Sequence, residues 1–216
     1  MTVVFGAGGC AKEVEWLIAE NNLVLDEKIQ IERFIAKEGK ADSFLGYPLQ
    51  EEIEFLKELK EIGNLNAFLA IANCVARRSV YERLTQEDKI NLQFPSVFHH
   101  SSVSDGRPGR FAYGFGNIVC ASTIFMPDVA MGNLNYVSLG SIIGHDTSIG
   151  NFVTIFPAVR IAGHVKIADS VIIGTGAIII ENIEICSNVI IGAGSVVNRN
   201  IVEAGTYVGV PAKKIK

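Results

Sequence analysis

The chain has 216 residues, of which 49% are hydrophobic and 19% charged, so it can bury a core and is not disordered. A net charge of −4 disfavours a nucleic-acid-binding protein, which would carry a basic excess. No apolar run is long enough for a membrane span, and the N-terminus has no basic region before an apolar stretch, so we expect no membrane partner and no secretory leader. The four cysteines are far apart without a CxxC pair, which predicts reduced thiols and a cytoplasmic location.

The distribution of charge divides the chain into two parts. Residues 1–110 hold 30 of the 42 charged side chains, whereas residues 111–216 hold 12. The change falls across the stretch HHSSVSDGRPGR. We therefore expect one domain at residues 1–97 and a second at residues 98–216.

The first part alternates apolar strand patterns with helical ones, which predicts a small Rossmann-like α/β domain with a parallel sheet. Strands are expected at residues 2–5, 29–34 and 66–73, and helices after the GAGGCA loop and at 51–60 and 75–84. Three or four strands are too few for a complete six-stranded dinucleotide-binding fold.

The GAGGCA loop matches the pattern G-x-G-x-x-A between a strand and a helix, where helix N–H groups can bind a phosphate. Glu32 follows about twenty residues later, so a nicotinamide cofactor has to be considered. The small size of the domain argues against that cofactor.

The second part has a strict six-residue period. Stepping by six from Val119 to Val197 gives fourteen consecutive apolar residues, and the positions four later are mostly small or β-branched, with Asn135 the exception. Neither a helix nor a plain strand has this period. It predicts a parallel β-helix in which three short strands form an 18-residue coil, with five coils between residues 119 and 208.

Residues 18 apart stack on the outside of such a β-helix. The column Ile124, Ile142, Arg160, Ile178 and Val196 is mostly aliphatic, and the column Tyr136, Thr154, Ile172 and Ile190 is partly so. Aliphatic columns facing water are unfavourable, which predicts that two of the three faces are buried against copies of the chain in a closed ring. Alternatively, these isoleucines only reflect β-propensity.

Three motifs in order, GAGGCAKEV, IIGHDTSIG and the ending VGVPAKKIK, resemble the bacterial sugar O-acyltransferase family. This family includes sialic acid O-acetyltransferase-like proteins and the nucleotide-aminosugar N-acetyltransferases of the bacillosamine and perosamine pathways. The resemblance covers nearly the whole chain. It implies a left-handed parallel β-helix, a homotrimer, and transfer of acetyl from acetyl-CoA to a nucleotide-linked aminosugar.

His145 and Asp146 are the expected catalytic pair. A neutral imidazole removes a proton from an attacking amine near pH 7, and an adjacent carboxylate can fix its tautomer if the turn brings the two together. Periodicity alone favours a histidine that merely caps a turn, whereas the family resemblance matches His145 to the catalytic base. His164 is expected to be structural.

Acetyl-CoA has a long arm that fits a groove along the stacked coils. Thr175 and Ala193 are 18 apart and small, and by resemblance they match coenzyme contacts of the family, as does Thr154, where the family often has histidine. The basic residues at the end of the chain are either contacts to the coenzyme phosphates or a solvated tail: Lys213, Lys214 and Lys216.

By resemblance, Gly8, Gly9 and Cys10 line the acceptor site. Two further departures from the family bear on that site. Glu32 and Arg33 stand where the family usually has two aspartates after the second strand, and Ala72 stands where it often has glycine. The identity of the acceptor therefore stays open.

Several alternatives remain from the sequence. The same base serves O-acetylation of a sugar hydroxyl, for instance in a sialic acid, and a β-helix without activity is a rival from another class. A covalent route through Cys120 or Cys186 has no histidine nearby in sequence. A β-helix carbonic anhydrase would need more zinc ligands than His145 and His164, which are 19 apart and so one residue out of register; we expect no metal.

Overall fold

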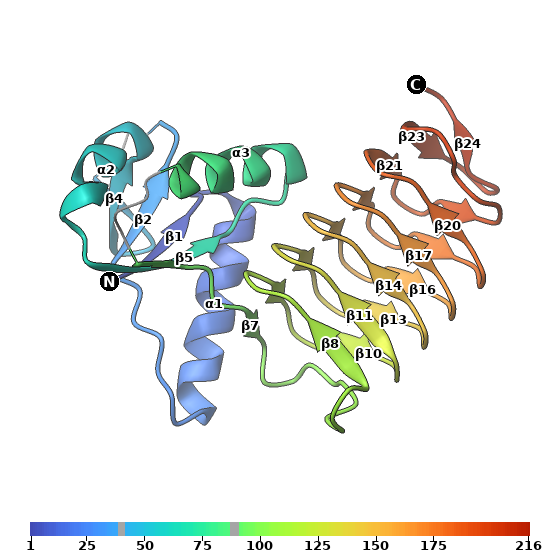
Figure 1. The fold of residues 1–216 in the computed structure, drawn as a ribbon, viewed down its shortest axis with the longest axis horizontal. Helices are drawn as coiled ribbons and strands as arrows, with labels where there is room; N and C mark the ends of the chain where they lie inside the picture. The colour runs from blue at the N-terminus through green and yellow to red at the C-terminus, as the bar shows by residue number, and fades with distance from the viewer. Residues whose placement is uncertain (39–41, 87–90) are drawn as a thin grey trace.

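The structure is a computed structural model that describes residues 1–38, 42–86 and 91–216. An α/β domain packs against the first coils of a β-helix, and the C-terminus lies at the far end of the coils (Figure 1). Among the described residues, no helix has both the length and the apolar character needed to cross a bilayer.

The N-terminal domain is a six-stranded sheet in the order β3-β4-β2-β1-β5-β6 with three α-helices. All strands are parallel except β3, which forms a hairpin with β4. The strands are β1 (Thr2–Phe5), β2 (Arg33–Ala36), β3 (Ser43–Phe44), β4 (Tyr47–Glu51), β5 (Asn64–Leu69) and β6 (Asn91–Gln93). The helices are α1 (Gly9–Val24), α2 (Glu52–Glu58), the short 3-10 helix η1 (Leu59–Glu61) and α3 (Cys74–Thr85).

The helices of this domain agree with the sequence analysis, but two strands do not. The strand expected at residues 66–73 is β5, which ends at Leu69, and the second strand is displaced along the chain. It was expected at residues 29–34 and begins only at Arg33. The side chain of Asn22 accepts from the N–H of Ile29 and donates to its carbonyl, at 2.9 and 2.8 Å, which holds this residue against α1 instead of in the sheet. The hairpin β3–β4 was not expected, so the sheet is larger than the predicted three or four strands.

The β-helix has three faces, each a parallel sheet for most of its length. The docked face contains β7 (Val97–Phe98), β9 (Ile118–Val119), β12 (Tyr136–Val137), β15 (Thr154–Ile155), β18 (Ile172–Ile173), β21 (Val189–Ile191), β23 (Gly205–Val208) and the antiparallel β24 (Lys213–Lys214). The aliphatic face contains β10 (Ile124–Phe125), β13 (Ile142–Ile143), β16 (Arg160–Ile161), β19 (Ile178–Ile179) and β22 (Val196–Val197). The polar face contains β8 (Phe111–Tyr113), β11 (Val129–Met131), β14 (Ser148–Ile149), β17 (Lys166–Ile167) and β20 (Glu184–Ile185).

The register of the coils confirms the predicted 18-residue repeat. Ile142 pairs with Arg160 and Arg160 with Ile178, so residues 18 apart lie one above another. The residues of the six-step series are buried in one continuous core. Several corners are closed by non-glycine residues in the left-handed region, among them Asp146 and His164, both at a φ of 56°. The expected division of the chain between residues 97 and 98 falls inside β7.

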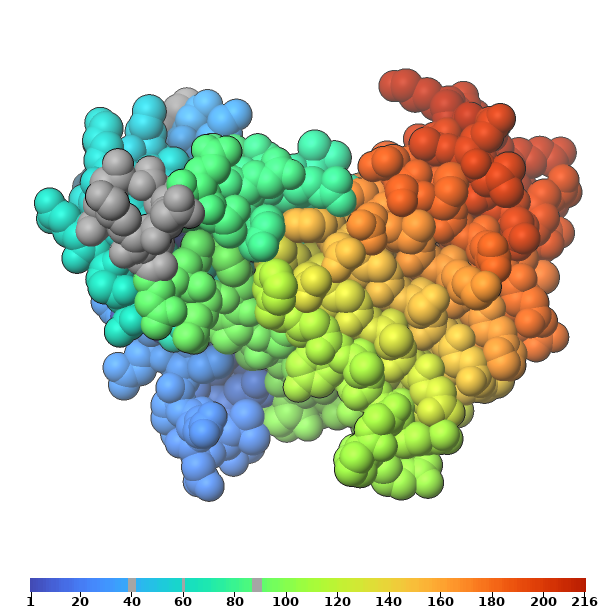
Figure 2. All heavy atoms as spheres, in the orientation of Figure 1, coloured from blue at the N-terminus to red at the C-terminus, as the bar shows by residue number. Residues whose placement is uncertain are grey.

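The N-terminal domain covers the early part of the docked face. The buried guanidinium of Arg77 on α3 links the two domains: it donates to the carbonyls of Ile71, Leu134 and Val153. Figure 2 shows the early coils in contact with this domain while the last coils, in red, stand clear of it. The prediction that two faces pack against copies is therefore wrong for the early docked face, because the chain's own first domain covers it.

Candidate active site

His145 and Asp146 lie together at the corner between the aliphatic and the polar faces, after β13. Nδ1 of His145 is 2.7 Å from Oδ2 of Asp146, and both side chains are about half exposed. The hydrogen bond from His145 lowers the pKa of Asp146 below its usual range, with smaller contributions from the nearby charges of His164 and Arg110. The ionised carboxylate accepts a hydrogen bond from the Nδ1–H group of His145. The lone pair of Nε2 is then free to take a proton from an attacking amine or hydroxyl group.

The next coil supports the imidazole of His145. A Cβ placed on Gly163 would lie 2.6 Å from Cε1 and 2.7 Å from Nε2 of His145, so the ring rests against the bare backbone of that glycine. Only glycine leaves space for the ring in its present position. Gly163 therefore supports the ring of His145 in its present position, a contact that the sequence analysis did not identify.

His164, which the sequence analysis expected to be structural, lies beside the pair of His145 and Asp146. Its ring lies 5.1 Å from the ring of His145, edge to face, and its Nε2 is 3.8 Å from Oδ2 of Asp146. The signal was present in the sequence: His164 was compared with His145, 19 residues earlier, but its partner in the 18-residue register is Asp146. One ring nitrogen of each histidine and one carboxylate oxygen of Asp146 all lie within 4.8 Å of one another.

Thr175 and Ala193 lie on adjacent coils at a different corner, between the docked and the aliphatic faces. Both are exposed, and the N–H of Gly194 donates to the carbonyl of Thr175 at 2.8 Å. In one chain they are thus separated from His145 by the width of the aliphatic face. Near the chain end, Lys214 pairs with Glu203 at 2.8 Å.

Thr154 does not lie on that corner. It is completely buried on the docked face, where its hydroxyl donates to the carbonyl of Ala72 at 2.6 Å and accepts from Arg77 at 3.0 Å. The expected coenzyme contact is therefore replaced by a contact between the two domains. The sequence register gave the correct column for Thr154 but not the domain that covers it.

The GAGGCA loop connects β1 to α1 at the carboxyl edge of the sheet, where parallel α/β sheets bind ligands. Gly8 and Gly9 are exposed at the start of α1. Beside the loop lies a cavity of about 320 Å³ whose lining includes Gly6, Lys37 and Arg83. Two cationic side chains line this cavity, but Glu52 also lines it, and its carboxylate pairs with Arg83 at 2.6 Å. Neither cation was singled out from the sequence.

Cys10 lies in the first turn of α1 and is partly buried. Burial raises the pKa of its thiol to about 12, against an opposing hydrogen bond with Tyr136. Burial likewise raises the pKa of Cys120 to about 12, and its Sγ lies 3.7 Å from the same phenol. Protonated, buried thiols are poor nucleophiles, which disfavours a covalent route through Cys120.

Glu32 and Arg33 lie at the opposite, amino edge of the sheet. The N–H of Thr2 donates to Glu32 at 3.0 Å, and Arg33 hydrogen-bonds Gln50 at 2.7 Å. The prediction that they follow the second strand is wrong because β2 starts four residues later than expected. Ala72 follows β5 at the carboxyl edge, but its carbonyl accepts from Thr154 and Arg77.

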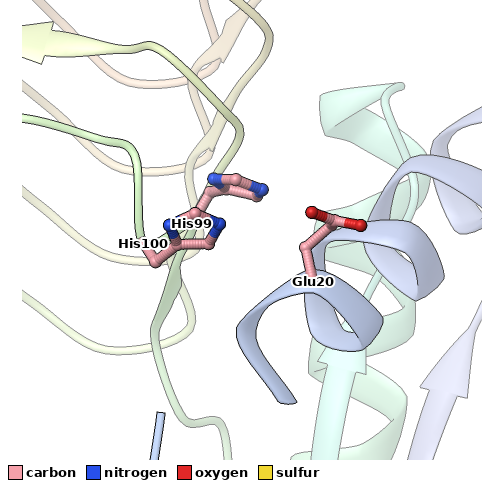
Figure 3. Close-up of side chains that lie close together, drawn as sticks. All are labelled: Glu20, His99 and His100. Carbon is pink, nitrogen blue, oxygen red and sulfur yellow. The ribbon is translucent and has the colours of Figure 1, made fainter. Parts of the chain in front are cut away.

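A second imidazole cluster combines Glu20 of α1 with His99 and His100, whose rings lie 4.3 Å apart (Figure 3). The N–H of Ser101 donates to Nδ1 of His99 at 3.1 Å, so a neutral ring carries its proton on Nε2. That buried nitrogen has no hydrogen-bond partner among the described residues. A ring with this proton arrangement does not offer Nε2 to a metal, which disfavours a metal site here.

The fold and the site define a class of protein: hexapeptide-repeat β-helix proteins with a histidine–aspartate pair at an exposed corner. Residues 2–84 match the family described as the PglD N-terminal domain. Among curated proteins, none has a matching sequence.

Solved structures match over the whole length. The chain is 25% identical to PerB from Caulobacter crescentus, solved in complex with CoA and GDP-perosamine, covering 100% of this chain and 97% of that one with a TM-score of 0.86. It is 27% identical to WeeI from Acinetobacter baumannii AYE, with 100% and 99% covered and a TM-score of 0.84. The acetyltransferase domain of PglB from Neisseria gonorrhoeae FA1090 shares the fold at 23% identity, with 99% and 98% covered and a TM-score of 0.83. These findings confirm the predicted family resemblance and the fold, a Rossmann-like domain on a left-handed β-helix.

Proposed function

We propose that the protein is an acetyl-CoA-dependent N-acetyltransferase that acts on the amine of a nucleotide-linked aminosugar. The observation that carries the proposal is the hydrogen bond between Nδ1 of His145 and Asp146 at an exposed corner, with Nε2 free. Support comes from similarity to PerB, whose structure contains CoA and GDP-perosamine. The amine attacks the thioester carbonyl, Nε2 of His145 takes a proton from it, and that proton then leaves with the CoA sulfur.

We propose that the active enzyme is a homotrimer, with each site built from two copies. The aliphatic face is uncovered in one chain, and its residue Ile178 is 43% exposed. His145 lies at one edge of this face, and Thr175 and Ala193 lie at the other. Packing the aliphatic faces around a threefold axis brings the base of one copy against the coenzyme corner of the next, a head-to-tail contact that closes a ring.

We propose that the diphosphate of the acceptor binds in the cavity beside Gly8 and Gly9, with Lys37 as its cationic partner. Arg83 also lines the cavity, where it pairs with Glu52 at 2.6 Å. Glu32 and Arg33 are left out because they lie at the other edge of the sheet. Cys10 is retained only as packing under the loop. The nucleotide base and the sugar are open.

The function is tested by incubating the purified protein with acetyl-CoA and a panel of nucleotide-linked aminosugars and sialic acids. Released thiol reports turnover, and hydroxylamine separates an ester product, which it cleaves, from an amide, which it leaves intact. A stable acetyl-amide supports the proposal, and an ester indicates the alternative O-acetyltransferase. No turnover with any acceptor would contradict an enzymatic role for the β-helix.

The shared site is tested by mixing two inactive variants, His145→Ala and Ala193→Trp. If the site lies between copies, randomly mixed trimers contain intact sites at about a quarter of their interfaces, and activity returns to about that fraction of wild type. If each chain holds a complete site, the mixture stays inactive. Sedimentation of the wild-type protein measures its mass independently.

A further inference from the structure

The active-site corner carries a second imidazole that the proposed reaction does not yet use. Oδ2 of Asp146 accepts from His145 at 2.7 Å and lies 3.8 Å from Nε2 of His164, so both rings face one oxygen. The second distance is that of an ion pair and is too long for a hydrogen bond. Asp146 and His164 occupy the same position on successive coils, so the repeat itself places the second ring over the carboxylate.

The backbone does not require histidine at this position. The same column continues to Asn182, which adopts nearly the same left-handed conformation at a φ of 60°. Asparagine is well suited to this conformation, so the turn would close without an imidazole. His164 is also 54% exposed and contributes to no core. A purely structural role therefore leaves the choice of a titratable ring unexplained.

The other charged groups near this corner come from the neighbouring coils. Arg110 lies on the side of the preceding coil, where it pairs with Asp128 at 2.8 Å. On the side of the following coil, Glu181 is exposed one coil after Gly163. Among the described residues, His145 and His164 are the groups that form ion pairs with Asp146.

The proposed reaction releases more protons than His145 can hold. The acceptor amine is an ammonium near neutral pH, so amide formation breaks two N–H bonds while a C–N bond forms and the C–S bond breaks. One proton ends on the CoA sulfur and the other reaches solvent. Nε2 of His145 can hold only one proton at a time. Because the ammonium group releases two protons, Nε2 has to lose the first before it can take the second.

We propose that His164 is a positioning residue that acts on His145 through the carboxylate that the two rings share. This inference rests on the proposed acetyl transfer. When His164 is neutral, Asp146 interacts mainly with His145, through the hydrogen bond to Nδ1. A protonated His164 is attracted to the same oxygen and repels a second positive charge on the ring of His145, which favours the form of His145 with a free Nε2.

The test is the pH dependence of kcat/KM in two variants. His164→Asn, the residue found in the next coil, should raise the midpoint of the acid limb by a few tenths of a pH unit and leave activity above pH 8 unchanged. His164→Lys places a permanent charge there and should lower the midpoint by about half a unit. His100→Asn, at an exposed histidine outside the site, should have the wild-type profile.

A second readout does not depend on turnover. Nitrogen NMR of His145 without substrates should show the same two opposite shifts of its titration, so a failed acetyltransferase assay and a failed inference can be told apart. Superimposable titrations in all three proteins would overturn the inference. Loss of activity at every pH in a folded His164→Asn variant, or activity that a chelator removes and zinc restores, would also overturn it, since these results assign direct catalysis or metal binding.

Discussion

The chain has two pairs of neighbouring imidazoles, and they differ in what surrounds them. His99 is buried between α1 and the first coil, and Ser101 fixes its Nδ1 as an acceptor. His145 is half exposed at a corner, and Asp146 fixes its Nδ1 as a donor. Nδ1 accepts a hydrogen bond in His99 and donates one in His145, so Nε2 carries a proton in His99 and a lone pair in His145. The ring of His99 has a buried proton on Nε2, and the ring of His145 presents the lone pair of Nε2 to solvent.

The largest expected effect is on the exposed pair. His145→Ala removes the base and should lower kcat by about two orders of magnitude or more, with thermal stability close to wild type because the side chain is exposed. His100→Ala, also exposed, should leave kcat unchanged. Steady-state kinetics with thiol detection measures both. Equal losses in the two variants would remove the distinction between the pairs.

Asp146→Asn tests what fixes the tautomer. The amide can donate to Nδ1 of His145 and so favour the ring with its proton on Nε2, which should lower kcat about 10- to 100-fold. Loss of the negative charge also makes His145 less basic, so the acid limb of kcat/KM should move to lower pH. Because the pKa of Asp146 is lowered, its carboxylate stays ionised over the pH range of the acid limb of kcat/KM. Protonation of Asp146 therefore does not cause that limb. A limb that moves upward would contradict this assignment.

Gly163→Ala tests the support of the base. The added methyl group meets the movable ring of His145 and not the backbone, so the ring should shift while the coil stays intact. We expect about a tenfold lower kcat with little change in melting temperature. Gly106→Ala, where a Cβ meets nothing within 4 Å, is the matched control. A fall in stability without a change in kcat would assign Gly163 to folding alone.

The smallest effect concerns the buried pair. Burial lowers the pKa of His99 from 6.5. On acidification, His99 therefore binds a proton in the unfolded chain before it does so in the folded protein. Stability should therefore fall as pH decreases below about 6.5 and level off below the folded pKa. His99→Asn keeps a side-chain acceptor for Ser101 and should reduce this dependence. Melting temperatures between pH 8 and 5 measure the difference, and identical slopes would contradict it.

Some of the site was accessible from the sequence because the coil repeats strictly. The spacing of 18 placed Thr175 beside Ala193, and it also pairs Asp146 with His164, although that second pair was overlooked. Glu32 was misplaced because its segment has a strand pattern but is held against α1 through Asn22. Thr154 was misassigned because the column that contains it is half covered by a domain whose docking leaves no periodic signal.

The sequence by itself determined the β-helix, because a core residue every six positions satisfies only a coil of three short strands. It also determined which side chains stack, since the register follows from the repeat length. The tertiary structure decided which face the first domain covers, which edge of the sheet each loop reaches, and which proton each histidine carries. Those outcomes depend on single hydrogen bonds between segments far apart in the chain, such as those of Arg77, and no local pattern encodes them.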